Sequence, residues 1–178
     1  MYICMSSSEL ATLQSAFVSA GGHWSTFVIW EKHTFTLGRS DYQRQYEPIL
    51  YGWKSGGAHY WCGDRDQSDV WQVPKPTVND LHPTMKPVEL VARAIRNNSR
   101  RGETVLDAFG GSGSTLIAAE KLGRRARLIE LEPRYVDVII RRWQEFTGAR
   151  AVLDGDGRTF VEIESERVAM GGSGLQIA

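Results

Sequence analysis

The chain has 178 residues, and its 21 lysines and arginines are balanced by 21 aspartates and glutamates. This length predicts one domain with short appendages. A hydrophobic content of 42%, with 24% charged residues and no net charge, excludes an intrinsically disordered chain. The zero net charge also excludes a globally basic nucleic-acid-binding protein, so any such binding must come from local patches.

Membrane insertion, secretion and metal binding find no support in the sequence. No apolar run approaches the roughly 20 residues that a membrane span needs, and the N-terminus lacks a signal-peptide pattern. Cys4 and Cys62 form no CxxC pair, and no zinc-ligand spacing occurs. We therefore expect two free thiols in a cytoplasmic protein, with neither a membrane nor a metal as partner.

The first 53 residues alternate strand and helix signals. Short apolar and β-branched runs predict strands over 2–5, 24–30 and 46–53, and helical apolar spacing predicts a helix over 10–18. Residues 54–81 contain several glycines, prolines and tryptophans without a period, which predicts an irregular excursion. Its length exceeds that of an ordinary connection, which suggests function or mobility.

From Pro87 onward the hydrophobic periodicity is sharper. It predicts helices that start at 87, 115 and 134, alternating with strands over 104–109 and 126–131. Residues 150–153 are a candidate third strand. This strand–helix alternation predicts a parallel sheet with right-handed crossovers. The glycine-rich end, residues 171–178, is expected to be loose.

The strongest chemical signal is the segment DAFGGSGS, residues 107–114, which ends a predicted strand and opens a predicted helix. Ligands of open α/β sheets bind at that edge, and a helix N-terminus favours an anionic group. Glu130 ends the next strand, about 20 residues later, where a carboxylate can accept hydrogen bonds from ribose hydroxyls. Together they predict a nucleoside-containing cofactor. The alternative is a structural turn with a capping Asp107 and a surface Glu130.

Two other nucleotide-binding patterns fit less well. The pair Gly111 and Gly113 is not followed by the third glycine of the dinucleotide fingerprint, and no Gly-Lys pair supplies a P-loop. A nicotinamide-dependent oxidoreductase is therefore the runner-up among intact enzymes.

Three segments resemble, in order and spacing, the S-adenosylmethionine-dependent DNA methyltransferases that modify adenine N6 or cytosine N4. Residues 107–114 resemble their D-P-F-x-G-S-G cofactor loop, with Ala108 in place of the usual proline. Residues 82–87 (HPTMKP) resemble their H-P-x-x-K-P segment, and residues 129–135 (IELEPRY) resemble their second-strand motif. The order of the two halves is that of the group often called beta, and the resemblance covers most of residues 1–155.

The resemblance implies a Rossmann-like α/β methyltransferase fold, S-adenosylmethionine as cofactor and double-stranded DNA as substrate. It implies that Asp107 lies beside the cofactor amine, that Thr84 and Lys86 meet its carboxylate, and that Glu130 holds its ribose. The implied cofactor-binding set is His82, Thr84, Lys86, Asp107, Phe109, Gly110, Gly111, Ser112, Gly113, Ser114 and Glu130.

The resemblance also divides the chain and suggests where DNA is bound. The expected parts are a remainder of the catalytic subdomain (1–53), an irregular target-recognition excursion (54–81), a cofactor-binding subdomain (82–155) and a tail (156–178). Residues 33–81 would face DNA. The candidate phosphate contacts are Arg39, Arg44, Lys54 and Arg65. The aromatic residues of this stretch, such as Trp61 and Trp71, could stack on bases, although such residues more often pack in a core.

The catalytic [DNS]-P-P-[YFW] motif of the family is absent, because no two prolines of the chain are adjacent. In the family this motif accepts the hydrogens of the target amine and stacks on the flipped base. It precedes the strand that begins here at Tyr2, so we expect the chain to start after it and assign no catalytic residue. In the family, the strand that carries this motif lies between the glycine-loop strand and the strand that the Tyr2 segment resembles. We therefore expect an incomplete sheet, with a gap or direct pairing there, and dependence on a complementing chain or segment.

Three hypotheses stay open. The chain is part of a methyltransferase and inactive alone, or a non-catalytic module that binds S-adenosylmethionine and DNA, or a prophage-type remnant. The sequence assigns neither the modified base, nor the recognition sequence, nor an accompanying restriction enzyme.

Overall fold

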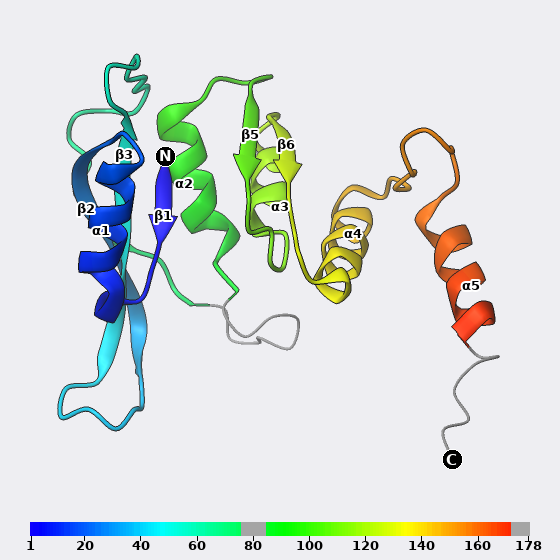
Figure 1. Ribbon diagram of the computed structural model, residues 1–178, viewed down its shortest axis with the longest axis horizontal. Coiled ribbons are helices and arrows are strands. Elements are labelled where there is room, and N and C mark those ends of the chain that lie inside the picture. Colours follow the sequence, from blue (N-terminus) through cyan, green and yellow to red (C-terminus); the bar gives the residue numbers. More distant parts are fainter. Residues whose placement is uncertain (76–84, 172–178) are drawn as a thin grey trace.

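The computed structural model describes residues 1–75 and 85–171 (Figure 1). In chain order the elements are β1 (Tyr2–Cys4), a short 3-10 helix (Ser7–Glu9), α1 (Leu10–Ser19), β2 (Gly22–Thr36), β3 (Arg44–Lys54), β4 (Val70–Gln72), α2 (Val88–Asn98), β5 (Thr104–Asp107), α3 (Ser114–Lys121), β6 (Arg125–Leu128), α4 (Pro133–Thr147) and α5 (Phe160–Gly171). Within these two ranges, none of the helices has the length and apolar character of a bilayer span.

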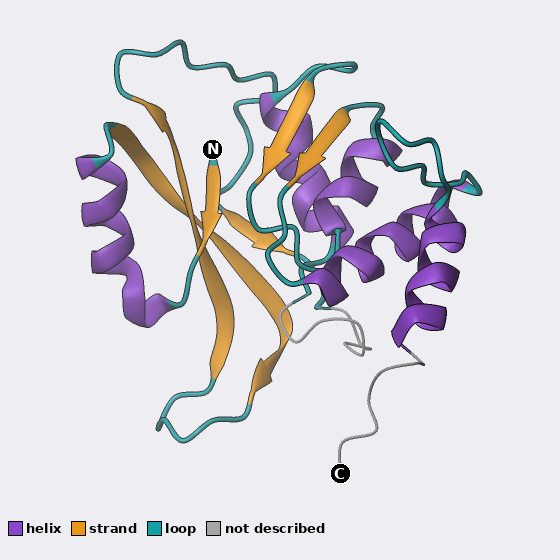
Figure 2. Cartoon of the chain, turned by 45° about the vertical axis from the view of Figure 1, so that its right-hand side comes forward, coloured by secondary structure: helices purple, strands orange, loops and turns teal. Residues whose placement is uncertain are grey.

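The strands form two separate sheets (Figure 2). The four-stranded sheet has the order β1-β3-β2-β4, in which β3 is antiparallel to β1 and β2, and β4 is parallel to β2. The two-stranded sheet pairs β5 with β6 in parallel. Among the described strands no ladder joins β1 to β5. Of the two arrangements expected from the sequence, direct pairing of these two strands is therefore not found among the described residues.

Helix α2 connects the two sheets through its side chains. Leu90, only 2% exposed, packs with Trp30 of the four-stranded sheet, whereas Ile95 packs with α3 and with Val105 of β5. At the end of α2, Asn98 Oδ1 accepts a hydrogen bond of 2.6 Å from the Tyr2 hydroxyl of β1. Figure 1 shows α2 between β1 and β5, which run in the same direction. β1 and β5 are edge strands, each paired on one side only, and both therefore lie beside the same helix.

The other face of the four-stranded sheet is covered by α1. Leu13 and Phe17 of α1 pack on Leu50, which has no exposed surface, and on Phe27 of β2. The next residue of β2, Val28, belongs to the cluster on the α2 side. This alternation is the period of two that a strand imposes, and it explains why β2 is apolar on both faces.

Three local predictions differ from the structure. Residues 150–153 form no third strand of the sheet, because the chain turns back on itself and Val152 makes only an isolated bridge to Thr159. Gly155 and Gly157 at φ +82° and +79° make this reversal sterically accessible. Residues 160–171, expected within a tail, form α5, and residues 70–72 of the excursion form β4.

Candidate functional site

The glycine loop joins the end of β5 to the start of α3. Gly111 and Gly113 adopt φ values of +54° and +81°, and Gly113 is the N-cap residue of α3. A Cβ atom on Gly110 would lie 3.0 Å from Ile139 Cδ1, and one on Gly113 would lie 3.1 Å from Ile139 Cγ2. Packing against α4 therefore accounts for glycine at 110 and 113, independently of any ligand.

Two carboxylates hold this loop in place. Asp107 accepts hydrogen bonds from the Phe109 N–H (3.0 Å) and from the Thr115 hydroxyl (2.6 Å). Glu130, just beyond β6, accepts a bond of 2.6 Å from the Gly111 N–H and another of 2.9 Å from the Glu132 N–H. The turn held by Asp107 is thus present. Glu130, in contrast, is not a simple surface residue, because its side chain links the segment after β6 to the glycine loop.

Lys86 connects the loop to the four-stranded sheet. Its carbonyl accepts a bond of 2.7 Å from the Ser114 hydroxyl, and its ammonium group lies 2.8 Å from Glu47 Oε2. The other oxygen of Glu47 lies 2.6 Å from Lys32 Nζ. Burial alone raises the pKa of Glu47, but the hydrogen bonds from the two lysines outweigh it and hold the pKa below its ordinary value.

Large apolar side chains surround the loop on its exposed side. Phe109, Ile129 and Leu131 are 89%, 61% and 96% exposed. The Gly110 N–H donates to the Ile129 carbonyl at 2.9 Å, which keeps the two chain segments together. An exposed apolar group next to backbone donors and a carboxylate is suited to an amphipathic ligand such as a nucleoside.

The structure brings most of the predicted cofactor residues together. These are Lys86, Asp107, Phe109, Gly110, Gly111, Ser112, Gly113, Ser114 and Glu130. His82 and Thr84 lie outside the described residues. Sequence reasoning missed Arg142, which donates to the Ser112 carbonyl, and the pair of Lys32 and Glu47. Their contacts depend on how α4 docks and on how β2 pairs with β3, which local patterns in the sequence do not specify.

The four predicted DNA contacts lie at opposite edges of the molecule. β3 runs from Arg44 to Lys54, and Lys54 therefore lies at the edge where Tyr2 contacts the end of α2. Arg65 is near it, because the neighbouring Cys62 and Gln67 are hydrogen-bonded to Asn97 of α2. The turn between β2 and β3 holds Arg39 and leads to Arg44 at the start of β3, and it lies at the other end of the molecule, toward which β1 and β5 point (Figure 1). Only this second pair lies on the side of the glycine loop.

The two tryptophans of the excursion pack on the core of the four-stranded sheet. Trp71 is 3% exposed in the cluster with Trp30, and Trp61 packs against the same cluster. Their interpretation as packing residues is therefore confirmed.

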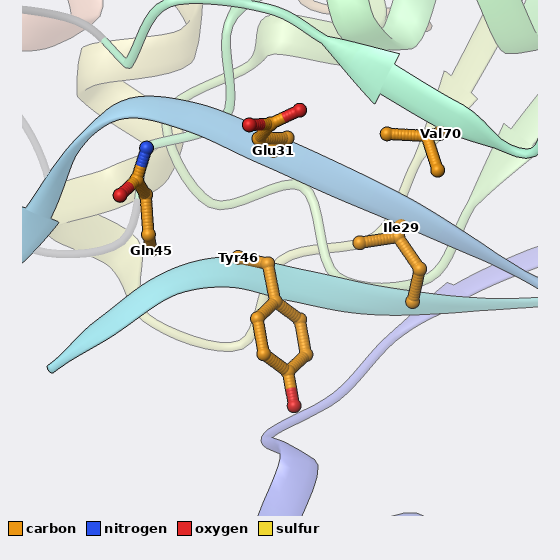
Figure 3. Close-up of a pocket in the computed structure, with 5 residues that line it drawn as sticks. All are labelled: Ile29, Glu31, Gln45, Tyr46 and Val70. Carbon is orange, nitrogen blue, oxygen red and sulfur yellow. The ribbon is translucent and has the colours of Figure 1, made fainter. Parts of the chain in front are cut away.

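Other possible ligand sites are less informative. A shallow pocket of about 320 Å³ lies on the four-stranded sheet, lined by Ile29, Glu31, Gln45, Tyr46 and Val70 (Figure 3). It contains none of the predicted site residues.

In the ranges that the structure covers, no three His, Cys, Asp or Glu side chains are grouped to hold a metal ion. Cys4 and Cys62 are free thiols.

The model of the N6/N4 DNA methylase family matches residues 4–141. The chain belongs to this family. The match confirms the resemblance seen in the sequence, and the mixed α/β architecture agrees with a Rossmann-like methyltransferase fold.

Individual relatives support the same assignment. The chain is 36% identical over 89 residues to the type II methyltransferase M2.MboI of Moraxella bovis, covering 48% of this chain and 33% of that protein. The structure of TTHA0409 from Thermus thermophilus with S-adenosyl-L-methionine superposes with a TM-score of 0.63, at 28% identity, covering 88% of this chain and 72% of that one. The M1.HpyAVI–SAM complex has the same fold, with a TM-score of 0.70 at 23% identity over 80% of this chain and 72% of that chain. The chain spans about a third of the length of the curated relatives it matches.

Proposed function

We propose that the chain binds S-adenosylmethionine at the glycine loop and serves methyl transfer to an exocyclic amine, adenine N6 or cytosine N4, in double-stranded DNA. The observation that carries this proposal is the 2.6 Å hydrogen bond between the Gly111 N–H and Glu130. It joins the carboxylate just beyond β6 to the loop before α3, and so places an acceptor for ribose hydroxyls beside the glycine loop.

The residues around the loop fit the parts of this cofactor. The Lys86 ammonium would meet the carboxylate, and Glu130 would accept hydrogen bonds from the ribose hydroxyls. Each oxygen of Asp107 accepts one hydrogen bond here and can accept another, so that Asp107 suits the cofactor ammonium. Phe109 and its exposed apolar neighbours would cover the adenine ring. His82 and Thr84 belong to the proposal through the resemblance.

The cofactor supplies an electrophilic methyl group, and the residues of this chain bind and orient it. A segment with the [DNS]-P-P-[YFW] motif must hold the target amine. We propose that a complementing chain or segment supplies it and that its strand lies beside α2 between β1 and β5. Two edge strands with unpaired backbone groups beside one helix support this placement, because a strand between them would satisfy both edges.

Titration calorimetry with S-adenosylmethionine tests the cofactor proposal. Binding by the unmodified chain should be lost in Gly111→Asp and in Glu130→Ala. Glu103→Ala is the matched control, because Glu103 also accepts a backbone N–H bond, from Arg100 at the opposite edge. The proposal fails if the unmodified chain gives neither heat nor a thermal shift with the cofactor.

DNA would be contacted by the turn between β2 and β3. Tyr42 and Leu37 in this turn are 93% and 82% exposed, and Arg39 and Arg44 can meet phosphates. Arg39→Gln combined with Arg44→Gln should weaken binding to a DNA duplex. The slope of log K against log salt concentration should become shallower by about the amount that two phosphate contacts contribute. The same change at Lys54 and Arg65 is the matched control and should have little effect. Equal losses in both pairs would contradict this placement.

DNA as substrate and the free thiols support a cytoplasmic location.

The second candidate function is a module that binds S-adenosylmethionine and DNA without catalysis. The absence of adjacent prolines, and the lack of a ladder between β1 and β5 in the part of the chain that the structure describes, favour it for the isolated chain. A methyl-incorporation assay on mixed DNA separates the two. Incorporation by the pure chain would show that it is active alone, and incorporation only after a polypeptide with the motif is added would support complementation. No incorporation in either case would support the module.

A further inference from the structure

Glu47 is shared by two lysines at the edge of the glycine loop. Its oxygens lie 2.6 Å from Lys32 Nζ and 2.8 Å from Lys86 Nζ. The three side chains are only 11–27% exposed. Among the described residues, no other carboxylate forms an ion pair with either lysine. Two positive charges and one negative charge therefore leave this group with a net charge of +1.

The group rests on a rigid apolar wall. Lys32 Nζ lies 5.0 Å and Lys86 Nζ 5.7 Å from the ring centroid of Trp30. Trp30 is 2% exposed, and its ring N–H donates to the Val73 carbonyl at 2.7 Å. Charges beside such a wall interact more strongly than charges in water, because less solvent screens them.

The two lysines differ in position. Lys86 contacts the start of α3 through its carbonyl, whereas Lys32 lies on β2, bound to the other oxygen of Glu47. Without Lys32, the Glu47 carboxylate would neutralise Lys86 completely. With Lys32 present, the carboxylate is divided between two ammonium groups, and Lys86 keeps positive charge.

We propose that Lys32 is a positioning residue that balances Glu47, so that Lys86 can attract the carboxylate of the cofactor. This inference rests on the proposed function, because it concerns the same cofactor. It adds a residue of β2 that acts through Glu47 and Lys86, and it makes the net charge of the group, rather than any single side chain, the determinant of affinity.

The test compares S-adenosylmethionine with decarboxylated S-adenosylmethionine, which lacks only the carboxylate. Lys32→Met should weaken binding of S-adenosylmethionine roughly three- to tenfold, because one positive charge near the carboxylate is lost. The affinity of the Lys32→Met variant for decarboxylated S-adenosylmethionine should not fall. Lys54→Met, which removes an equal charge at the opposite edge, is the matched control and should leave both affinities unchanged.

Two further variants separate charge from packing. Lys32→Arg keeps the charge and should keep the affinity. Lys32→Met combined with Glu47→Gln restores the net charge of +1 and should recover most of the lost affinity, which a purely structural role of Lys32 would not predict. The inference is overturned if Lys32→Met weakens both ligands equally or neither, or if the double variant shows no recovery. If the unmodified chain binds neither ligand, the proposed function itself is wrong.

Discussion

Replacing Gly113 by alanine should destabilise the protein through two separable effects. Gly113 has φ +81°, and a left-handed backbone costs a residue with a Cβ atom roughly 1 kcal/mol. The added Cβ would also lie 3.1–3.3 Å from Cγ2, Cγ1 and Cα of Ile139, a residue that is 7% exposed in α4. Overpacking of this kind costs about 1–3 kcal/mol, so that the total loss should be about 2–4 kcal/mol.

Gly148 provides the matched control. It has φ +71°, but a Cβ atom there would meet nothing within 4 Å. Gly148→Ala should therefore cost only the backbone component of roughly 1 kcal/mol. The two variants should differ by about 2 kcal/mol, which corresponds to roughly 4–8 °C in Tm for a chain of this size. Urea denaturation followed by circular dichroism, with thermal melts, measures both. Equal losses in the two variants would refute the argument, because they would show that Ile139 does not confine the loop.

Three further perturbations test the contacts of the site. Thr115→Val removes the hydroxyl that donates to Asp107 and should cost about 1–3 kcal/mol in urea denaturation, whereas Thr115→Ser should retain most of the stability. Arg142→Met leaves the buried Ser112 carbonyl without its donor, so that amide exchange should accelerate in residues 109–114 and not in α1. Glu47 has a pKa below the ordinary 4.5, so its ion pairs stabilise the fold above that pH and are lost as the pH falls through the lowered pKa. The stability advantage of the native chain over Glu47→Gln should therefore shrink on acidification from about pH 5 to pH 3, and an advantage independent of pH would contradict this assignment.

The local sequence was sufficient for most elements and for the centre of the site. The apolar periodicity predicted α1 to α4 and the strands they connect, because each period is a property of neighbouring residues. The position of the glycine loop and of Glu130 followed as well, since the carboxyl ends of adjacent parallel strands meet at one edge. Residues 150–153 misled the prediction, because a short apolar run does not distinguish a strand from a reversed turn.

Long-range contacts determine the parts of the site and of the fold that the local sequence did not predict. Lys32, Glu47 and Lys86 meet because β2 and β3 pair in one register, with Trp30 opposite Glu47. The helix that follows Lys86, α2, packs on Trp30 through Leu90. Lys54 and Arg44, close in the sequence, lie at opposite edges because a strand of 11 residues separates its ends by roughly 35 Å. Composition and periodicity describe what each segment favours. Which charges are neighbours, and which strand edges stay open, depends on packing between segments that the sequence keeps far apart.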